Sequence, residues 1–188
     1  MPTQRSLGNV KMPMDELLDL PAIQTICEKN NCVFLIKKHF YHRNEIEHLE
    51  QYQNIFDITG EDIDPETLTY QADIMISDYS ASYIDYLLLD RPIIFYAYDL
   101  ENFLKNERDM YLKFEDIHAG YKPQTKNELN DALETVCSSW TDDEHKEGRL
   151  EIRRKYFDDD ISVGKAREDI VKIMHQLIDG TYVSKWRK

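Results

Sequence analysis

The sequence predicts an α/β fold in which a parallel sheet is flanked by helices. Two short apolar runs, Asp73–Ile76 and Pro92–Tyr98, have the length and composition of buried strands. The segment between them, Tyr79–Leu89, places apolar and aromatic residues at spacings of three and four, which is typical of a helix. A strand, a helix and a second strand within about 30 residues form a βαβ unit, and the two strands of such a unit run parallel.

The residues before this unit continue the same alternation. Met14–Asn30 has helical spacing with a break at Pro21, and the apolar run Cys32–Lys38 predicts a buried strand. Ile55–Ile58 predicts another strand, and Asp64-Pro65-Glu66 predicts the start of a helix capped by its aspartate. This order of helices and strands is typical of a doubly wound α/β domain.

The C-terminal third of the chain is predicted to be mainly helical. Residues 124–180 contain three segments with helical spacing, namely Thr125–Trp140, Glu144–Phe157 and Gly164–Ile178. Thr125 precedes Glu128 by three residues, as in a capping box. Residues 1–11 are polar, contain Pro and Gly, and are predicted to be extended. We expect one domain spanning residues 1–188.

Composition and charge exclude several classes of function. The formal net charge of −13 argues against nucleic-acid binding, and against adhesion of this domain by itself to an anionic membrane. Three cysteines without a CxxC spacing predict reduced thiols in a cytoplasmic protein. No apolar run approaches the roughly 18 residues that a membrane span needs, and no leader peptide is recognisable.

The turn Ser77–Ser82 is the first candidate site. It follows a predicted strand and precedes a predicted helix, at the edge where open α/β sheets bind ligands. Unpaired backbone N–H groups at a helix start attract anions, and Ser80 and Ser82 add hydroxyl donors. The turn could therefore hold a phosphate group. Alternatively, Ser77, Asp78 or Ser80 serves only as a helix cap, because no glycine-rich phosphate loop accompanies the turn.

Two further polar strand ends would converge on this turn in a parallel sheet. Lys37-Lys38-His39 follows the first strand, and Asp57–Glu61 follows the second. Cations, an imidazole and serine hydroxyls at one edge could bind a diphosphate and assist its departure as a leaving group. The alternative is that His39 is an ordinary surface histidine and the lysines a solvated pair. No ligand spacing favours a metal, and no GxSxG elbow favours a serine nucleophile.

The central stretch resembles the signature of one enzyme family. Ser77–Tyr86, SDYSASYIDY, is similar to a "TDYSS…FD" turn and helix, and Asp90–Leu100, DRPIIFYAYDL, is similar to an "RPxxFYxYD" strand. Three shorter matches are Pro2-Thr3-Gln4-Arg5 with "PTWR", Lys37-Lys38-His39 with "RxH", and Arg108 with Met110-Tyr111 with "RGFY". Together these motifs resemble the CDP-glycerol glycerophosphotransferases, which are the teichoic-acid primases and polymerases.

The resemblance implies a GT-B-type transferase with two Rossmann-like domains, of which this chain is the C-terminal, donor-binding one. It implies that His39 is the catalytic histidine at the CDP diphosphate. It further implies that the substrate-binding residues are Arg5, Lys37, Asp78, Ser80, Ser82 and Arg108. No metal and no cofactor are expected.

By the same resemblance, the expected function is transfer of glycerol phosphate, or a related polyol phosphate, from a CDP-polyol donor to a polyol-phosphate acceptor. The acceptor would bind through an N-terminal domain that is not in this sequence, so the isolated chain is expected to be inactive. The parent protein would be peripheral at the inner face of the plasma membrane. The alternatives are a glycosyltransferase donor domain for UDP- or GDP-sugars and a non-catalytic binding module of the same fold.

Overall fold

The computed structural model describes residues 14–38, 46–106, 112–139, 143–157 and 165–183. Internal contacts divide the chain into two compact units, Met1–Arg153 and Arg154–Lys188, and the described strands all belong to the first unit. No helix within the described ranges is both long enough and apolar enough to cross a membrane. The segment 1–11, predicted to be extended, lies outside the described residues.

Four strands form two parallel pairs. β1 (Phe34–Ile36) pairs with β2 (Ile55–Asp57), and β3 (Met75–Ser77) pairs with β4 (Ile93–Phe95). Each strand lies within or next to a predicted apolar run, and the parallel βαβ unit from β3 to β4 is confirmed.

The expected single sheet is divided in two. Among the described strands, hydrogen bonds join β1 to β2 and β3 to β4, and a cavity lies between β1 and β3. On its other side β4 gains an extended neighbour: the Phe95 N–H donates to the Tyr121 carbonyl at 2.7 Å, and the Ala97 N–H donates to the Pro123 carbonyl at 2.9 Å. The sequence predicts a loop at Asp116–Lys122, because this stretch lacks the alternating apolar pattern of a strand.

The first pair of strands is buried on one face only. In β1 the side chain of Ile36 is buried, whereas Leu35 is 50% exposed. Leu35 lies opposite Phe56 of β2, which is 45% exposed, so the two side chains share the uncovered face. The predicted strand at Cys32–Lys38 is present, but it is buried on one face only, because a continuous apolar run does not distinguish a strand covered on both faces from one covered on a single face.

The helix boundaries follow local capping chemistry. α1 (Met14–Leu17) ends before α2 (Leu20–Asn30), and the carboxylate of Asp19 accepts a hydrogen bond from the Ala22 N–H at 3.2 Å. Pro21 lies in the first turn of α2, where its missing N–H leaves no hydrogen bond unmade. The break predicted near Pro21 is thus confirmed.

Both caps that the sequence predicts at Asp64 and Thr125 are present. α3 (Pro65–Gln71) begins after Asp64, whose carboxylate accepts from the Thr67 N–H at 2.9 Å. Before α6 (Lys126–Ser139), the Glu128 N–H donates to the Thr125 hydroxyl at 3.3 Å, and the Thr125 N–H donates to the Glu128 carboxylate at 3.1 Å. These reciprocal bonds form the predicted capping box.

The remaining helical elements are shorter or lie later in the chain. They are η1 (Leu49–Gln51), α4 (Ser82–Tyr86), η2 (Leu87–Leu89), α5 (Leu100–Asn106), η3 (Phe114–Asp116), α7 (Lys146–Tyr156) and α8 (Ala166–Ile178). α6, α7 and α8 supply the helices expected in the C-terminal third. That residues 1–188 form a single nucleotide-binding domain stays a prediction.

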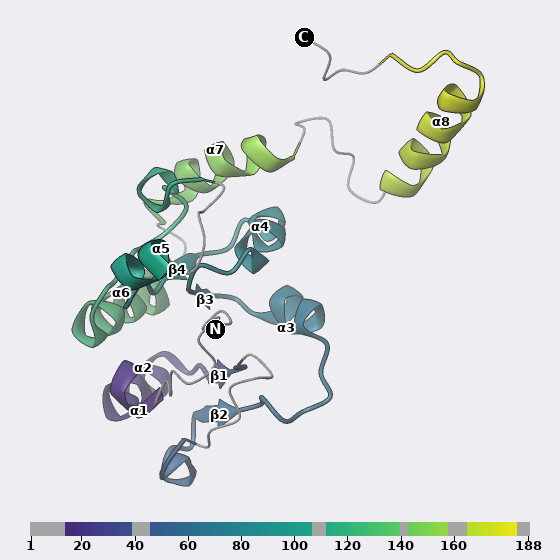
Figure 1. Ribbon diagram of the computed structural model, residues 1–188. Coiled ribbons are helices and arrows are strands. Elements are labelled where there is room, and N and C mark those ends of the chain that lie inside the picture. The colour runs from purple at the N-terminus through teal and green to yellow at the C-terminus, as the bar shows by residue number, and fades with distance from the viewer. Residues whose placement is uncertain (1–13, 39–45, 107–111, 140–142, 158–164, 184–188) are drawn as a thin grey trace. The chain divides into compact units, whose positions relative to one another are not determined.

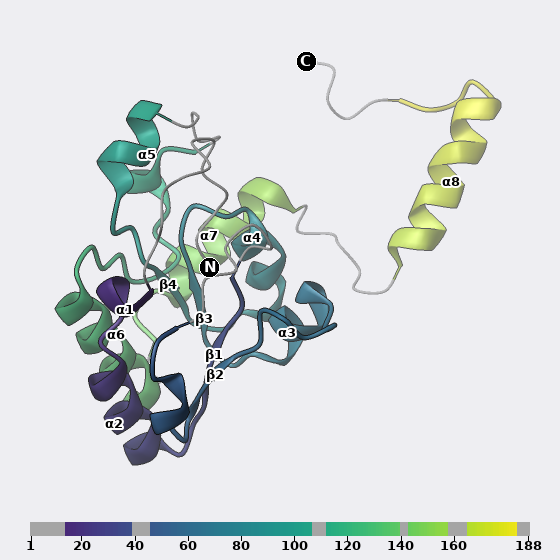
Figure 2. The same ribbon diagram turned by 60° about the horizontal axis from the view of Figure 1, so that its bottom comes forward.

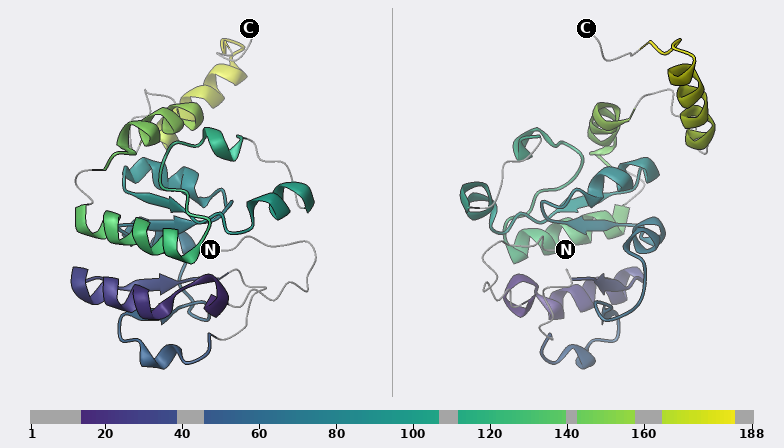
Figure 3. Two further views of the ribbon diagram at one scale, coloured as in Figure 1. Left: turned by 90° about the vertical axis from the view of Figure 1, so that its left-hand side faces the viewer. Right: turned by 45° about the vertical axis from the view of Figure 1, so that its right-hand side comes forward.

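The first unit is layered around its strands. Figures 1 and 2 show α2 and α6 on one side of the strands, and α3 and α4 on the other. Figure 3 shows α2 and α6 side by side. The core between these layers includes the fully buried side chains of Ile23, Ile94 and Leu129. This arrangement leaves the polar carboxyl ends of the strands at one edge.

Candidate functional site

The carboxyl ends of β1 and β2 are joined by a buried ion pair. The Lys38 ammonium lies 2.6 Å from the Asp57 carboxylate, and the Lys38 side chain is only 4% exposed. Thr59 completes the group, because its N–H donates to Asp57 at 3.0 Å and its hydroxyl accepts from the Lys38 N–H at 2.9 Å. Burial raises the pKa of Asp57, but the hydrogen bonds from Lys38 and Thr59 outweigh burial and hold that pKa below its usual value.

Lys37 is bound by backbone carbonyl groups at the same edge. Its ammonium donates to the Glu61 carbonyl at 2.8 Å and to the Ile58 carbonyl at 3.4 Å. These contacts hold the loop after β2 against the end of β1. Carbonyl oxygens carry no full charge, so the ammonium keeps its attraction for an anion. The two adjacent lysines therefore have different environments. Lys38 forms a buried ion pair, whereas Lys37 donates to carbonyl groups of the loop after β2.

The turn after β3 is shaped by its own side chains. Asp78 is buried, and its carboxylate accepts from the Ser80 N–H at 3.0 Å. The Ser80 hydroxyl accepts from the Ser82 hydroxyl at 3.0 Å and from the Ser82 N–H at 3.4 Å. Ser80 is half-buried and Ser82 is exposed. Asp78 therefore fixes the turn from inside, while the two hydroxyl groups lie at the surface.

The helix after this turn starts later than predicted. α4 begins at Ser82 rather than at Tyr79, and the chain continues as the 3₁₀ segment η2 from Leu87. Ala81 occupies the N-cap position, which no side chain caps. The prediction that Ser77, Asp78 or Ser80 is the N-cap is wrong, because hydrogen bonds inside the turn hold Asp78 and Ser80 three residues and one residue before the N-cap Ala81. A five-residue helix also has a weak dipole, so hydroxyl groups and cations matter more for anion binding here.

A cavity of about 640 Å³ lies between β1 and β3 and reaches the carboxyl ends of both strands. Apolar side chains of β1, β3 and the helices that cover them form most of its wall, and the polar residues Lys37, Ser77 and Asp78 line it as well. Ser77 is 2% exposed, and its hydroxyl has no hydrogen-bond partner within the described part of the chain. An unpaired buried hydroxyl lowers the stability of the folded protein by about 1–3 kcal/mol. A ligand that forms a hydrogen bond to this hydroxyl removes that cost and therefore binds more tightly.

Tyr79 and Arg91, two further residues of the central signature, stabilise the fold. The Tyr79 hydroxyl donates to the Asp99 carboxylate at 3.0 Å, and the Tyr79 ring stacks on Phe103 at 4.2 Å between centroids. Burial, followed by the charge of Asp99, raises the pKa of Tyr79, so the phenol stays protonated and donates. Arg91 donates to the carbonyls of Tyr70 and Ala72 at 2.9 and 2.7 Å. These residues position the turn and its helix.

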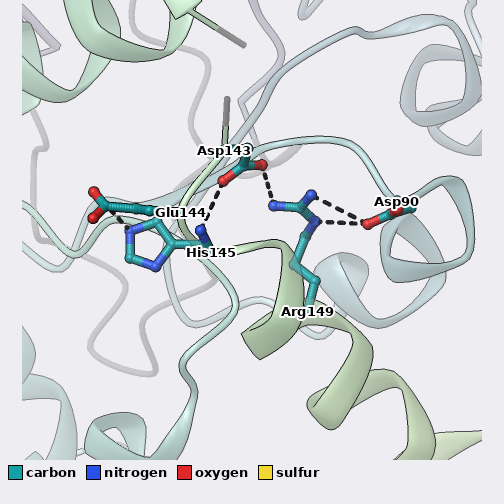
Figure 4. Close-up of polar contacts among 5 residues, drawn as sticks. All are labelled: Asp90, Asp143, Glu144, His145 and Arg149. Carbon is teal, nitrogen blue, oxygen red and sulfur yellow. Dashed lines mark hydrogen bonds and ion pairs between the residues drawn. The ribbon is translucent and has the colours of Figure 1, made fainter. Parts of the chain in front are cut away.

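A second ionic cluster lies at the start of the signature strand. Figure 4 shows the Arg149 guanidinium of α7 between two carboxylates. It donates to Asp90 at 3.1 and 3.2 Å and also to Asp143, and the Arg149 side chain is 3% exposed. Asp90 precedes β4, so this cluster lies at the amino end of the strand, away from the polar carboxyl edge. It therefore fastens α7 to the strand.

His145 lies beside this cluster. Its backbone N–H donates to Asp143 at 2.9 Å (Figure 4). Its ring meets Tyr121 edge-on at 4.4 Å between centroids. Burial lowers the pKa of His145, although Glu144 and Asp143 act in the opposite direction. Burial, with a hydrogen bond to Glu144, raises the pKa of Tyr121 to about 12. This group helps to hold the Tyr121 segment against β4.

Four of the seven predicted site residues can be placed. Lys37 and Asp78 line the same cavity, and Ser80 and Ser82 are bonded to each other on the adjoining turn. The other three predicted residues, Arg5, His39 and Arg108, lie outside the described residues. Within the described ranges no group of three or more histidine, cysteine or acidic side chains could hold a metal ion.

From the sequence, Ser77 belongs to the candidate turn but is considered only as a helix cap. In the structure Ser77 is the last residue of β3, so its side chain belongs to the strand and not to the turn. The sequence also predicts that the strand ends with Lys38 and with Asp57–Glu61 converge, but not that Lys38 and Asp57 form an ion pair. Pairing across two strands depends on their register.

Fold and site together define an α/β domain with a largely apolar, ligand-sized cavity that has polar groups at the carboxyl ends of its parallel strands. Residues 1–176 match the profile of the family described as CDP-Glycerol:Poly(glycerophosphate) glycerophosphotransferase. The chain belongs to this family, as the sequence motifs predict.

Curated relatives and a solved structure agree with that membership. Teichoic acid ribitol-phosphate polymerase TarL of Staphylococcus aureus is 32% identical over 117 residues, which cover 62% of this chain and 21% of the polymerase. Teichoic acid ribitol-phosphate primase of Bacillus spizizenii is 34% identical over 119 residues, which cover 63% of this chain and 30% of the primase.

The solved structure of the wall teichoic acid polymerase TagF superimposes with a TM-score of 0.66 at 25% identity, covering 95% of this chain and 42% of that one. This likeness confirms the predicted fold class. The chain spans less than half the length of each of these three relatives.

Proposed function

We propose that this chain binds the CDP-polyol donor of a polyol-phosphate transferase that acts in teichoic-acid or surface-polymer synthesis. The observation that carries the proposal is the buried, unpaired Ser77 hydroxyl on a cavity shared with Lys37, at the turn where the family signature lies. A diphosphate offers the acceptor oxygens that such a hydroxyl and such an ammonium need. The relatives' names supply the chemical class, since they include ribitol-phosphate and glycerol-phosphate polymerases.

In the proposed reaction, an acceptor hydroxyl attacks the β-phosphorus of the CDP-polyol. A new P–O bond forms to the acceptor, the P–O bond to CMP breaks, and a base takes the hydroxyl proton. Negative charge grows on the diphosphate oxygens as CMP leaves, so donors aimed at those oxygens lower the barrier. Lys37, Ser77, Ser80 and Ser82 are the described donors, and His39 is the proposed catalytic contact.

Arg5 and Arg108 are proposed as further cationic contacts to the donor. Asp78 acts indirectly, because its carboxylate is used to hold the Ser80 N–H. This assignment separates the predicted residues by role. Ser80 and Ser82 contact phosphate, whereas Asp78 keeps those hydroxyl groups in place.

The acceptor site is proposed to lie in the part of the related transferases that this chain does not span. The isolated chain would then bind the donor without turning it over. We further propose that the complete transferase works as a peripheral protein at the inner face of the plasma membrane, where a growing polyol-phosphate polymer would be held.

Titration calorimetry of site variants tests the proposal. Ser80→Ala and His39→Ala should each weaken CDP-glycerol or CDP-ribitol binding by about tenfold, the loss expected for one hydrogen bond to a charged group. Ser138→Ala is the matched control, because Ser138 is an exposed serine on α6 whose hydroxyl donates to the Thr135 carbonyl at 3.1 Å. Equal affinity in all variants would contradict the assigned site.

A further inference from the structure

Thr59 lies where the carboxyl ends of β1 and β2 meet the loop that follows β2. Its N–H donates to the Asp57 carboxylate at 3.0 Å, and its hydroxyl accepts from the Lys38 N–H at 2.9 Å. One residue therefore joins the backbone that follows β1 to the last side chain of β2. Because Asp57 also pairs with the buried Lys38 ammonium, at 2.6 Å, this junction is held rigidly.

The same loop provides both carbonyl groups that bind Lys37. The Ile58 carbonyl, directly before Thr59, accepts from the ammonium at 3.4 Å, and the Glu61 carbonyl, two residues after Thr59, accepts from it at 2.8 Å. A turn closes the loop between them, since the Glu61 N–H donates to the Ile58 carbonyl at 3.2 Å. The position of the Lys37 ammonium is therefore set by a loop that Thr59 fastens to the end of β1.

The Lys37 ammonium retains the capacity to bind a ligand. An ammonium group has three N–H donors, and the two carbonyls use two of them, so a third donor can reach a phosphate oxygen in the cavity that Lys37 lines. A solvated lysine side chain loses much conformational freedom when it binds a ligand. A lysine that its neighbours already hold loses less, and it therefore binds the ligand more tightly.

We propose that Thr59 is a positioning residue of the donor site and acts through Lys37. The described residues that line the cavity include Lys37 and not Thr59. Thr59 holds the loop, and the loop carbonyls hold the ammonium where it meets the diphosphate. The inference rests on the proposed function, and it names the residue that sets the place of one phosphate contact. If Thr59 served the fold alone, its hydroxyl would affect stability but not affinity.

Calorimetry with CDP-glycerol on the 188-residue chain tests the proposal. Thr59→Val removes the hydroxyl but keeps the side-chain shape and the N–H that bonds to Asp57, and it should weaken binding about fivefold. Thr59→Ser restores the hydroxyl and should bind within about twofold of the wild type. Unchanged affinity in Thr59→Val, or an equal loss in Thr59→Ser, would overturn the proposal.

Thr135→Val is the matched control. Thr135 is an exposed threonine on α6, and its hydroxyl donates to the Asp131 carbonyl at 2.8 Å. This variant loses one threonine hydroxyl far along the chain from Lys37 and should bind CDP-glycerol within about twofold of the wild type. A loss as large as that of Thr59→Val would mean that the effect is not specific to the loop, and would overturn the proposal.

A double-mutant cycle with Lys37→Met separates positioning from a general effect on the fold. If Thr59 acts through Lys37, Thr59→Val should change the affinity by less than about twofold once Lys37 is replaced by methionine. Losses that multiply in the double variant would mean that Thr59 acts by another route, and would overturn the proposal. The proposal is also overturned if Lys37→Met alone leaves the affinity unchanged.

Thermal unfolding shows whether each variant is folded at the titration temperature. If Thr59→Val is unfolded there, Thr59→Ala takes its place in the same cycle. If the wild type binds CDP-glycerol and the Thr59 variants alone depart from expectation, the positioning role fails while the proposed function stands. If the folded wild type binds no CDP-polyol, the proposed function fails and the positioning role falls with it.

Discussion

Ser77 links folding to binding at the scale of a single residue. Its hydroxyl is buried without a partner among the described residues, so it costs stability in the free protein. Ser77→Ala should leave the free energy of unfolding unchanged or raise it by up to about 1 kcal/mol, while weakening CDP-polyol binding about tenfold. Urea unfolding and calorimetry on one preparation measure both effects. Loss of stability together with full affinity would indicate a purely structural serine.

Asp57 makes stability depend on pH. Its pKa in the folded protein lies below its value in the unfolded chain, so its contribution is complete above about pH 4 and is lost as pH falls through the folded pKa. At pH 7, Asp57→Asn should lower the free energy of unfolding by about 2 kcal/mol, because it leaves the Lys38 charge buried without its counter-ion.

The difference between wild type and Asp57→Asn should therefore shrink below about pH 4. Urea midpoints at a series of pH values measure it. The exposed Asp62→Asn is the control and should have little effect at any pH. A difference that stays constant down to about pH 2 would contradict the ion pair as its source.

At the scale of elements, two glycines fix the segment between β4 and α7. A Cβ at Gly120 would lie 1.9 Å from the Ile93 carbonyl oxygen, and one at Gly148 would lie 1.9 Å from the His118 carbonyl oxygen. Gly120→Ala should destabilise the fold by about 3 kcal/mol or more, since backbone must move. Gly60→Ala has open space around its Cβ and serves as the control in thermal unfolding. Similar Tm values for both variants would refute this close packing.

Arg149 attaches α7 to the start of β4. Arg149→Met keeps the apolar stem but leaves Asp90 and Asp143 without their shared cation, which should cost about 3 kcal/mol of stability. The exposed Arg167→Met on α8 is the matched control and should cost less than about 0.5 kcal/mol. Chemical unfolding measures both values, and equal effects would show that the buried cluster contributes no more than a surface charge.

Elements were predictable where local chemistry alone defines them. The caps at Asp64 and Thr125 follow from side chains next to the helix start, and the structure confirms them. The start of α4 was not predictable from periodicity, because Asp78 and Ser80 use their side chains to form a turn instead of a cap. The exposed side of β1 depends on which faces the helices cover, and that is a property of the whole fold.

For the whole molecule, the motifs predicted the family and the fold class, and they indicated the polar edge. They could not predict the cavity between β1 and β3, since its existence depends on how two short strand pairs are spaced. They also could not show that Lys38 pairs with Asp57 while Lys37 donates to backbone carbonyls, because adjacent lysines look alike in sequence. Register and burial make that distinction.

The most direct test of the central claim is a calorimetric comparison of nucleotides on the 188-residue chain. We expect CDP-glycerol or CDP-ribitol to bind at least about tenfold more tightly than UDP-glucose. CMP should bind more weakly than the CDP-polyol, and no donor should be consumed. Preference for the UDP-sugar, or equal indifference of folded protein to every ligand, would contradict a CDP-polyol donor site.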